Sequence, residues 1–263
     1  MKWIIASLKK IPRFFAQKTK YYGGLAALIV YSFRNYFTDN KGRSRINKVL
    51  LMQIYFTGNL ALKLVGLVAL ALGATTVIPL FAQLSQFGSL DLIGKILNIV
   101  IVRELGPLIT ALIVISRSGT AIAAEIGTMM VNDEVNAMEM LGIDTLKFII
   151  FPRIAGMVIS MIILTIYFDA IGLIGGFIVG NLAAGITFDM FTTYVMNSIT
   201  VLDILISILK SAAFGLFASA ISVYFGFQAF ASTQIPQVTT KAVMGSIFSL
   251  FFVDIVITIV SYL

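Results

Sequence analysis

The stretch Leu64–Ala82, LVGLVALALGATTVIPLFA, decides the fold class of this chain because it runs for 19 residues without a charged side chain. An α-helix rises about 1.5 Å per residue, so roughly 20 apolar residues are needed to cross the hydrocarbon core of a bilayer, which is about 30 Å thick. This stretch therefore predicts a transmembrane helix.

Four further apolar segments predict four more spans. They are Ile96–Ser116, Phe148–Ala184, Ile204–Ala231 and Ala242–Leu263. The second of these is too long for one perpendicular span and too short for two, which favours one tilted or bent helix. Its glycines at 172, 175, 176 and 180 would permit close contact with a neighbouring helix.

The composition of the whole chain supports an all-α polytopic membrane protein. Hydrophobic residues make up 59% of the chain and charged residues 12%, with a mean hydropathy of +1.00. A soluble domain carries about a quarter charged residues, so the excess apolar surface here needs a lipid environment. Histidine and cysteine are both absent, which excludes disulfides, thiolate nucleophiles, imidazole bases and the usual zinc or haem ligands. We expect no metal or cofactor.

Positive charge is concentrated at the N-terminal end. Residues 1–48 hold eleven Lys and Arg against the single acid Asp39. Ile4, Leu8, Ile11 and Phe15 share one helical face, so residues 1–20 are predicted to form an amphipathic interfacial helix. The cations alternate with apolar residues, which favours a membrane surface over nucleic acid as the partner.

This distribution divides the chain into a basic N-terminal segment, 1–48, and a transmembrane domain, 49–263. The positive-inside rule places the N-terminus in the cytoplasm, and five spans then place the C-terminus outside. Residues 21–37 are interpreted as a second interfacial or re-entrant piece. Six spans result if residues 21–37 cross fully, but the basic leader would then lie outside, against the charge rule.

Charged residues inside the spans are candidates for function, because a charge at the centre of a membrane helix costs roughly 2.5–3.5 kcal/mol on insertion scales. These residues are Arg103, Glu104, Asp169, Lys210 and Asp254. For Asp169 and Asp254, pairing between helices for folding is an equally good explanation. For Arg103, Glu104 and Lys210 we favour a chamber that receives a zwitterionic or anionic headgroup.

The pair Gly106-Pro107 follows Glu104 closely. A proline inside an apolar helix frees a backbone carbonyl that only protein or water can satisfy. We predict a helix break at a polar site, with an ordinary proline kink as the alternative.

Residues 123–147 predict a cytoplasmic loop with helical content. They contain five acids, which are Glu125, Asp133, Glu134, Glu139 and Asp144. The segment is either a solvated connector or, because methionines and other apolar residues alternate with the acids, a docking surface. The sequence contains no G-x-x-x-x-G-K-[ST] phosphate loop. The chain is therefore not expected to hydrolyse ATP by that route itself.

Three motifs point to one family. They are Arg103-Glu-Leu-Gly-Pro-Leu-Ile-Thr-Ala-Leu112, Arg117-Ser-Gly-Thr-Ala-Ile-Ala-Ala-Glu-Ile-Gly127, and Ala137-Met-Glu-Met-Leu-Gly-Ile-Asp144 followed by Pro152-Arg153. Together they resemble the signature of MlaE/YrbE-type permeases, the membrane subunits of ABC transporters that work with MCE-domain proteins in phospholipid trafficking. The resemblance covers about residues 45–263.

This resemblance implies a homodimer that moves phospholipids, with ATP hydrolysis on a partner subunit. The loop between the second and third spans would dock on this cytoplasmic ATPase through a helix at about 131–141. The candidate contacts are Asp133, Glu134 and Glu139. The expected location is the bacterial inner membrane, with the plastid inner envelope as the alternative.

The resemblance also implies a lipid cavity at the dimer interface, open to the outer side, where an MCE ring would sit. Four charged residues match positions near this cavity, namely Arg103, Glu104, Lys210 and, at the start of the last span, Lys241. The lipid species and the direction of transport stay open.

Two other functions remain as alternatives. A self-contained proton-coupled carrier would use Glu104 or Asp169 to take up the proton, but such carriers usually have inverted repeats with paired broken helices, and the sequence has one convincing Gly-Pro break. A membrane enzyme acting on lipid would use the same two residues as base and acid. It ranks last because histidine, cysteine and a metal cluster are lacking.

Overall fold

The computed structural model describes residues 29–34, 36, 43–84 and 91–263, and every regular element in this part of the chain is helical. Five stretches are long and apolar enough to cross a membrane, and they are Arg43–Leu80, Gly94–Val131, Leu146–Leu182, Val201–Gly226 and Ser232–Tyr262. The predicted all-α polytopic fold with five spans is therefore confirmed.

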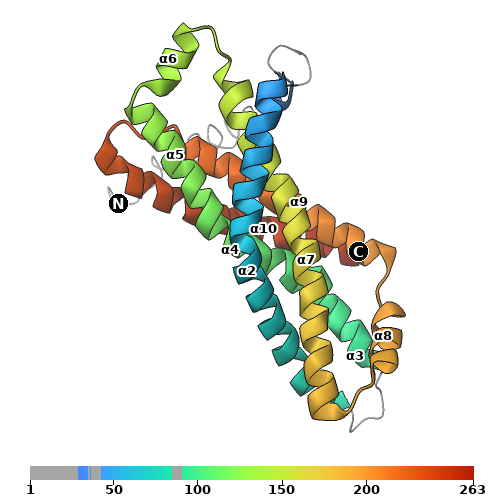
Figure 1. Cartoon of the computed structure of the whole chain (residues 1–263). Coiled ribbons are helices and arrows are strands. Elements are labelled where there is room, and N and C mark those ends of the chain that lie inside the picture. The colour runs from blue at the N-terminus through green and yellow to red at the C-terminus, as the bar shows by residue number, and fades with distance from the viewer. Residues whose placement is uncertain (1–28, 35, 37–42, 85–90) are drawn as a thin grey trace, which may run out of the picture.

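The two longest helices, α2 (Arg43–Leu84) and α7 (Phe151–Ala184), lie side by side and run in the same direction (Figure 1). Glycines let their backbones approach closely. A Cβ atom on Gly175 would lie 2.5 Å from the carbonyl oxygen of Leu70, and one on Gly73 would collide with the Gly172 carbonyl. Small residues at such crossings are typical of membrane helices. The predicted close contact at the glycines of the third span is therefore confirmed.

The second span is one continuous helical run with two wider turns. It consists of α3 (Asp91–Leu97), the π-helix η2 (Asn98–Leu105), α4 (Gly106–Val114), the π-helix η3 (Ile115–Gly119) and α5 (Thr120–Val131).

The run does not break at Gly106-Pro107 but changes its hydrogen-bonding pattern there. The Gly106 N–H donates to the carbonyl of Ile101, five residues earlier, as in a π-turn. Pro107 follows as the second residue of α4, directly after this change of pattern.

The loop predicted at 123–147 is shorter than expected. Its first part is α5, which stays helical because Ile122, Ala123, Ile126 and Gly127 form a buried face. A short helix, α6 (Glu134–Met140), and the π-helix η4 (Leu146–Ile150) follow. Asp133 before α6 and Gly142 after it have positive φ values of 57° and 73°. Figure 1 shows α6 projecting at the end of the molecule where α2 begins.

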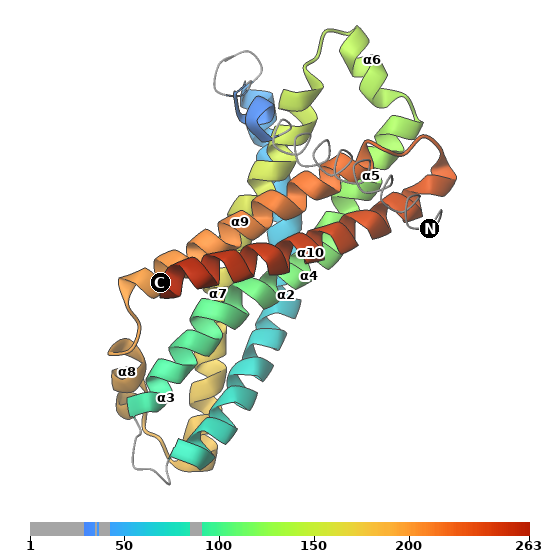
Figure 2. The ribbon, with the colours of Figure 1, turned by 180° about the vertical axis from the view of Figure 1, so that it is seen from behind.

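Helices α9 (Val201–Gly226) and α10 (Ile235–Tyr262) form an antiparallel hairpin joined through the 3₁₀ turn η5 (Ser232–Gln234) (Figure 2). In α10 only 11% of the most apolar part of the span is buried inside the protein, against 33% or more of the corresponding part in each of the other four spans. Helix α10 therefore lies at the surface of the helix bundle. A short helix that sequence reasoning did not assign, α8 (Phe188–Met196), packs against α3 at the end opposite α6.

Only part of the N-terminal segment is described, and the interfacial helix predicted at 1–20 lies outside this part. Residues 29–34 and 36 are helical. The Tyr36 ring stacks on Phe151 with centroids 3.9 Å apart, and Phe33 meets the same ring edge-on at 5.3 Å. These described residues thus pack at the start of α7.

Candidate functional site: a buried charge cluster and an acidic projection

Lys210 is the centre of a charge cluster between η2, α9 and α10. Its side chain is fully buried, and its Nζ lies 2.6 Å from Glu104 Oε2 and 3.0 Å from Asp254 Oδ1. Thr258 Oγ1 donates a long hydrogen bond, 3.4 Å, to the same oxygen of Glu104. One lysine thus holds together two carboxylates from different helices. Asp254, for which folding and function were equally good explanations, belongs to this cluster.

Arg103, next to Glu104 in η2, forms a second ion pair with Asp203 at 3.3 Å. Its Nη2 also donates to the carbonyl and the hydroxyl of Ser261, at 3.2 and 3.0 Å, and its guanidinium lies 4.1 Å from the centroid of the Tyr262 ring. Arg103 therefore ties η2 to the start of α9 and to the last turn of α10.

Sequence reasoning missed Asp203, because the fourth span was predicted to begin one residue later. Asp203 and Thr200 form a capping box at the start of α9, in which each side chain accepts a hydrogen bond from the other residue's N–H. Asn98 Nδ2 donates to Asp203 Oδ2 at 2.7 Å. The signal that could have found this residue is the Thr-x-x-Asp spacing directly before an apolar run.

The cluster carries two cations, Arg103 and Lys210, and three acids, Glu104, Asp203 and Asp254. The exposed fractions of the Arg103 and Glu104 side chains are 12% and 29%, and Lys210 has none. In this conformation every predicted cavity cation of the cluster is already paired. A headgroup could reach Lys210 only if the ion pairs opened.

Asp169 in α7 lies apart from these ion pairs. Ser207 Oγ in α9 donates to its Oδ2 at 3.3 Å, and the other oxygen of the carboxyl lies so close to Gly106 that no side chain would fit there. Among the described residues no cation pairs with Asp169. This close contact with Asp169 explains why the residue before Pro107 is a glycine.

Lys241, the fourth predicted cavity residue, is not brought to this cluster. It is exposed in the second turn of α10, 13 positions before Asp254. At 1.5 Å per residue the two backbone positions are roughly 20 Å apart along the helix.

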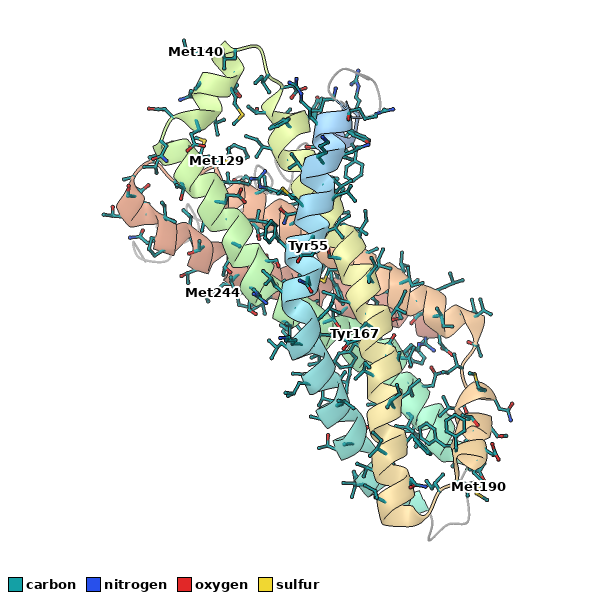
Figure 3. The ribbon with its side chains drawn as sticks, viewed as in Figure 1. Tyr55, Met129, Met140, Tyr167, Met190 and Met244 are labelled. Carbon is teal, nitrogen blue, oxygen red and sulfur yellow. The ribbon has the colours of Figure 1, made fainter. Side chains whose placement is uncertain are left out.

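The three predicted coupling acids, Asp133, Glu134 and Glu139, are all exposed on or beside α6. Met140 and Leu141 at the tip are 89% and 77% exposed, and Figure 3 shows Met140 at the outer end of the projection. Val135 is buried and anchors α6 to the body of the protein. The projection combines negative charge with an uncovered apolar tip.

A further ion pair lies where the projection joins the spans. Arg153 Nη2 in α7 lies 2.8 Å from Glu125 Oε1 in α5. Two cavities share this pair. One, about 430 Å³, extends toward Glu134, and the other, about 390 Å³, extends between α2 and η3 toward Arg117.

The fold and these motifs agree with the comparison with known families. A sequence model described as "Permease MlaE" matches residues 50–260. The chain belongs to the MlaE permease family. Its relatives include the "Intermembrane phospholipid transport system permease protein MlaE" of Haemophilus influenzae, which is 30% identical over 226 residues, 84% of this chain and 87% of the relative.

Two other relatives of this MlaE-family protein come from another bacterium and from a plant. A "Probable ABC transporter permease protein" of Rickettsia bellii is 30% identical over 199 residues, 75% of this chain and 77% of the relative. The chloroplastic "Protein TRIGALACTOSYLDIACYLGLYCEROL 1" of Arabidopsis thaliana is 28% identical over 209 residues, 79% of this chain and 60% of the relative. The family membership supports a membrane transport subunit rather than an enzyme.

Proposed function

We propose that this protein is the permease subunit of an ABC transporter that moves phospholipids between membranes of the cell envelope. A separate cytoplasmic ATPase would supply the energy, and an MCE-domain protein would receive or deliver the lipid on the outer side. The observation that carries this proposal is the acidic projection, Asp133 to Leu141, on a chain of apolar spans that has no phosphate-loop motif of its own.

The projection suits an ATPase contact for a physical reason. Exposed Met140 and Leu141 would supply apolar contact area, and Asp133, Glu134 and Glu139 would orient a basic partner. Arg43, Arg45 and Lys48 at the start of α2 lie at the same end of the molecule, which supports a cytoplasmic location for this end (Figure 1). The location that follows is the bacterial inner membrane.

A homodimer would complete the lipid cavity. Helix α10 carries an uncovered apolar face along most of its length, with Phe248, Phe251, Phe252, Ile255 and Ile259 exposed. The charge cluster lies directly behind this helix, so a second copy packed near α10 would enclose space beside Glu104 and Arg103. The far end, with exposed Phe188, Met190 and Met196 on α8, is the surface we assign to the MCE protein.

The first test is purification of the complex with the ATPase under native conditions. Glu139→Arg should release the ATPase, because it reverses a charge beside the apolar tip. Asp189→Arg is the matched control, since Asp189 is an exposed acid on α8 at the opposite end. Loss of the ATPase from both variants, or from neither, would contradict the assignment of the projection.

The second test is phospholipid transfer by reconstituted protein. We expect transfer to require ATP and the ATPase. A proton-coupled carrier remains the second candidate, because Asp169 is a carboxyl inside the bundle with Ser207 as its hydrogen-bond donor and no paired cation in the described residues. Transfer by the isolated protein under a pH gradient, without ATP, would favour that carrier.

A further inference from the structure

A groove between α2, η3 and α7 combines unsatisfied positive charge with an apolar wall. The cavity of about 390 Å³ is lined by Met52, Phe56 and Leu60 of α2, by Arg117 of η3, and by Glu125 and Arg153. Arg117 lies 14 positions after Arg103 in the same helical run, so the groove is roughly 20 Å from the Lys210 cluster along the helix. It is a separate place in the fold.

Within the described part of the chain, Arg117 is the cation of this groove that no acid pairs with. Its side chain is exposed and its guanidinium donates to the main-chain carbonyl of Leu60, and none of the ion pairs among the described residues involves it. Arg153 is 7% exposed, paired with Glu125 at 2.8 Å, and its Nε–H has no hydrogen-bond partner within the described residues. Two arginines and one glutamate leave a net charge of +1.

The wall facing Arg117 is apolar. Met52, Phe56 and Leu60 are 64%, 53% and 49% exposed, and they follow one face of α2 at a spacing of four residues. A volume near 390 Å³ is at the lower end of small-ligand sites. It suits a headgroup with its glycerol, while acyl chains would continue along the exposed side chains into the bilayer.

The chain's own N-terminal segment is a poor occupant for this groove. Residues 1–48 carry eleven cations and one acid, so Arg117 would repel most of that segment. A phosphate is complementary instead, because arginine binds phosphate oxygens through two parallel N–H groups.

We propose that this groove binds the phosphate headgroup of an anionic phospholipid through Arg117, with the ion pair between buried Arg153 and exposed Glu125 forming its inner wall. The proposal concerns a second lipid site and does not require that the protein transport lipid. The adjoining cavity, which shares Glu125 and Arg153, is lined by Glu134 of the projection. The Arg153–Glu125 pair therefore separates the groove from the cavity that reaches the surface assigned to the ATPase.

The test uses a fluorescent reporter in the groove. Trp3 is the single tryptophan of the chain, so Trp3→Phe with Phe56→Trp leaves one indole beside Arg117. The full-length protein is placed in nanodiscs of zwitterionic lipid with increasing fractions of brominated phosphatidylglycerol or brominated phosphatidylcholine. We expect quenching at a several-fold lower fraction of the anionic lipid.

Arg117→Gln should raise the half-quenching fraction of the anionic lipid several-fold, to that of phosphatidylcholine, because a charge-assisted hydrogen bond is lost. Arg117→Lys should restore part of the preference. Lys63→Gln is the matched control, since Lys63 is an exposed cation of α2 near Leu60 that does not line the groove, and it should change little.

Equal quenching by the two lipids, or a preference that survives Arg117→Gln, would overturn the proposal. Quenching that appears only after removal of residues 1–28 would overturn it too, by showing that the chain's own segment fills the groove. Glycerol phosphate that relieves quenching at millimolar concentration would support the anion site and identify the free phosphate as a competing source. The experiment measures lipid binding in the absence of the ATPase. A failure of the transport proposal would therefore not change its result.

Discussion

Replacing Lys210 by methionine should destabilise the protein more than any other single neutralisation in the spans. The substitution keeps an unbranched apolar side chain of nearly the same length but leaves Glu104 and Asp254 without the cation that lies 2.6 and 3.0 Å from them. Removing one partner of a buried ion pair costs about 3–5 kcal/mol. Glu104 retains 29% exposure, so water can relieve part of its charge, and we expect about 3 kcal/mol.

A neutral triple variant separates folding from function. Lys210→Met combined with Glu104→Met and Asp254→Leu removes all three charges, and replacing a whole buried ionic cluster by apolar residues of similar volume is often neutral or stabilising. We expect its stability to lie within about 1 kcal/mol of the parent protein. If the charges serve lipid transfer, the triple variant will be folded but inactive. If they serve only folding, it will be folded and active.

The assay is unfolding by increasing mole fractions of sodium dodecyl sulfate in mixed micelles, followed by far-ultraviolet circular dichroism. Lys63→Met is the control, because this lysine of α2 is exposed. A destabilisation by Lys210→Met no larger than that of the control would refute the inference that Lys210 neutralises the two acids. So would a triple variant as unstable as the single one.

Two further predictions use the same assay. Gly175→Ala should destabilise the protein by about 1–3 kcal/mol, because the new Cβ would lie 2.5 Å from the Leu70 carbonyl oxygen, whereas Gly58→Ala, with no atom within 4 Å, should be neutral or stabilising. Equal effects would show that α2 and α7 are not closely packed. Thr200→Ala should cost about 1 kcal/mol as the loss of a helix cap, and Asp203→Ala clearly more because Arg103 also loses its acid. Equal costs would mean that the Arg103–Asp203 pair contributes nothing.

The spans could be predicted from the sequence because membrane insertion depends on local composition. Leu64–Ala82 needs no knowledge of its neighbours to be recognised as a span. The continuation of the second span through α5 could not be read in the same way, since Glu125 favoured a loop with helical content from residue 123. Its buried residues, Ile122 and Ile126 with Ala123 and Gly127, carry the four-residue spacing of a helix face, and this weaker signal was outweighed by charge.

The pairing of the intramembrane charges could not be predicted, because it joins residues that are distant in sequence. Glu104 and Lys210 are 106 positions apart, and Arg103 and Asp203 are 100 apart. The free-energy cost of a charge inside the membrane implies that each charged side chain needs a partner, but it does not identify that partner. The same holds for Gly106-Pro107, where sequence indicated a missing hydrogen bond and the structure supplies a π-turn in place of a break.

The two arginine-bearing π-segments differ in a way that bears on the proposed transport. Arg103 in η2 is paired with Asp203, and neighbouring Lys210 is paired twice, so a headgroup arriving there must displace an internal acid. Arg117 in η3 has no ion-pair partner in the described residues, so a phosphate can bind it without breaking one. Displacement at the charge cluster would break contacts to Asp254, Thr258 and Ser261 of α10, the least buried span, and the contact to Asp203 at the start of α9. If the proposed ATPase drives transport, its work would be needed at the cluster and not at the groove, and α10, which is the least buried span, is the helix we expect to move.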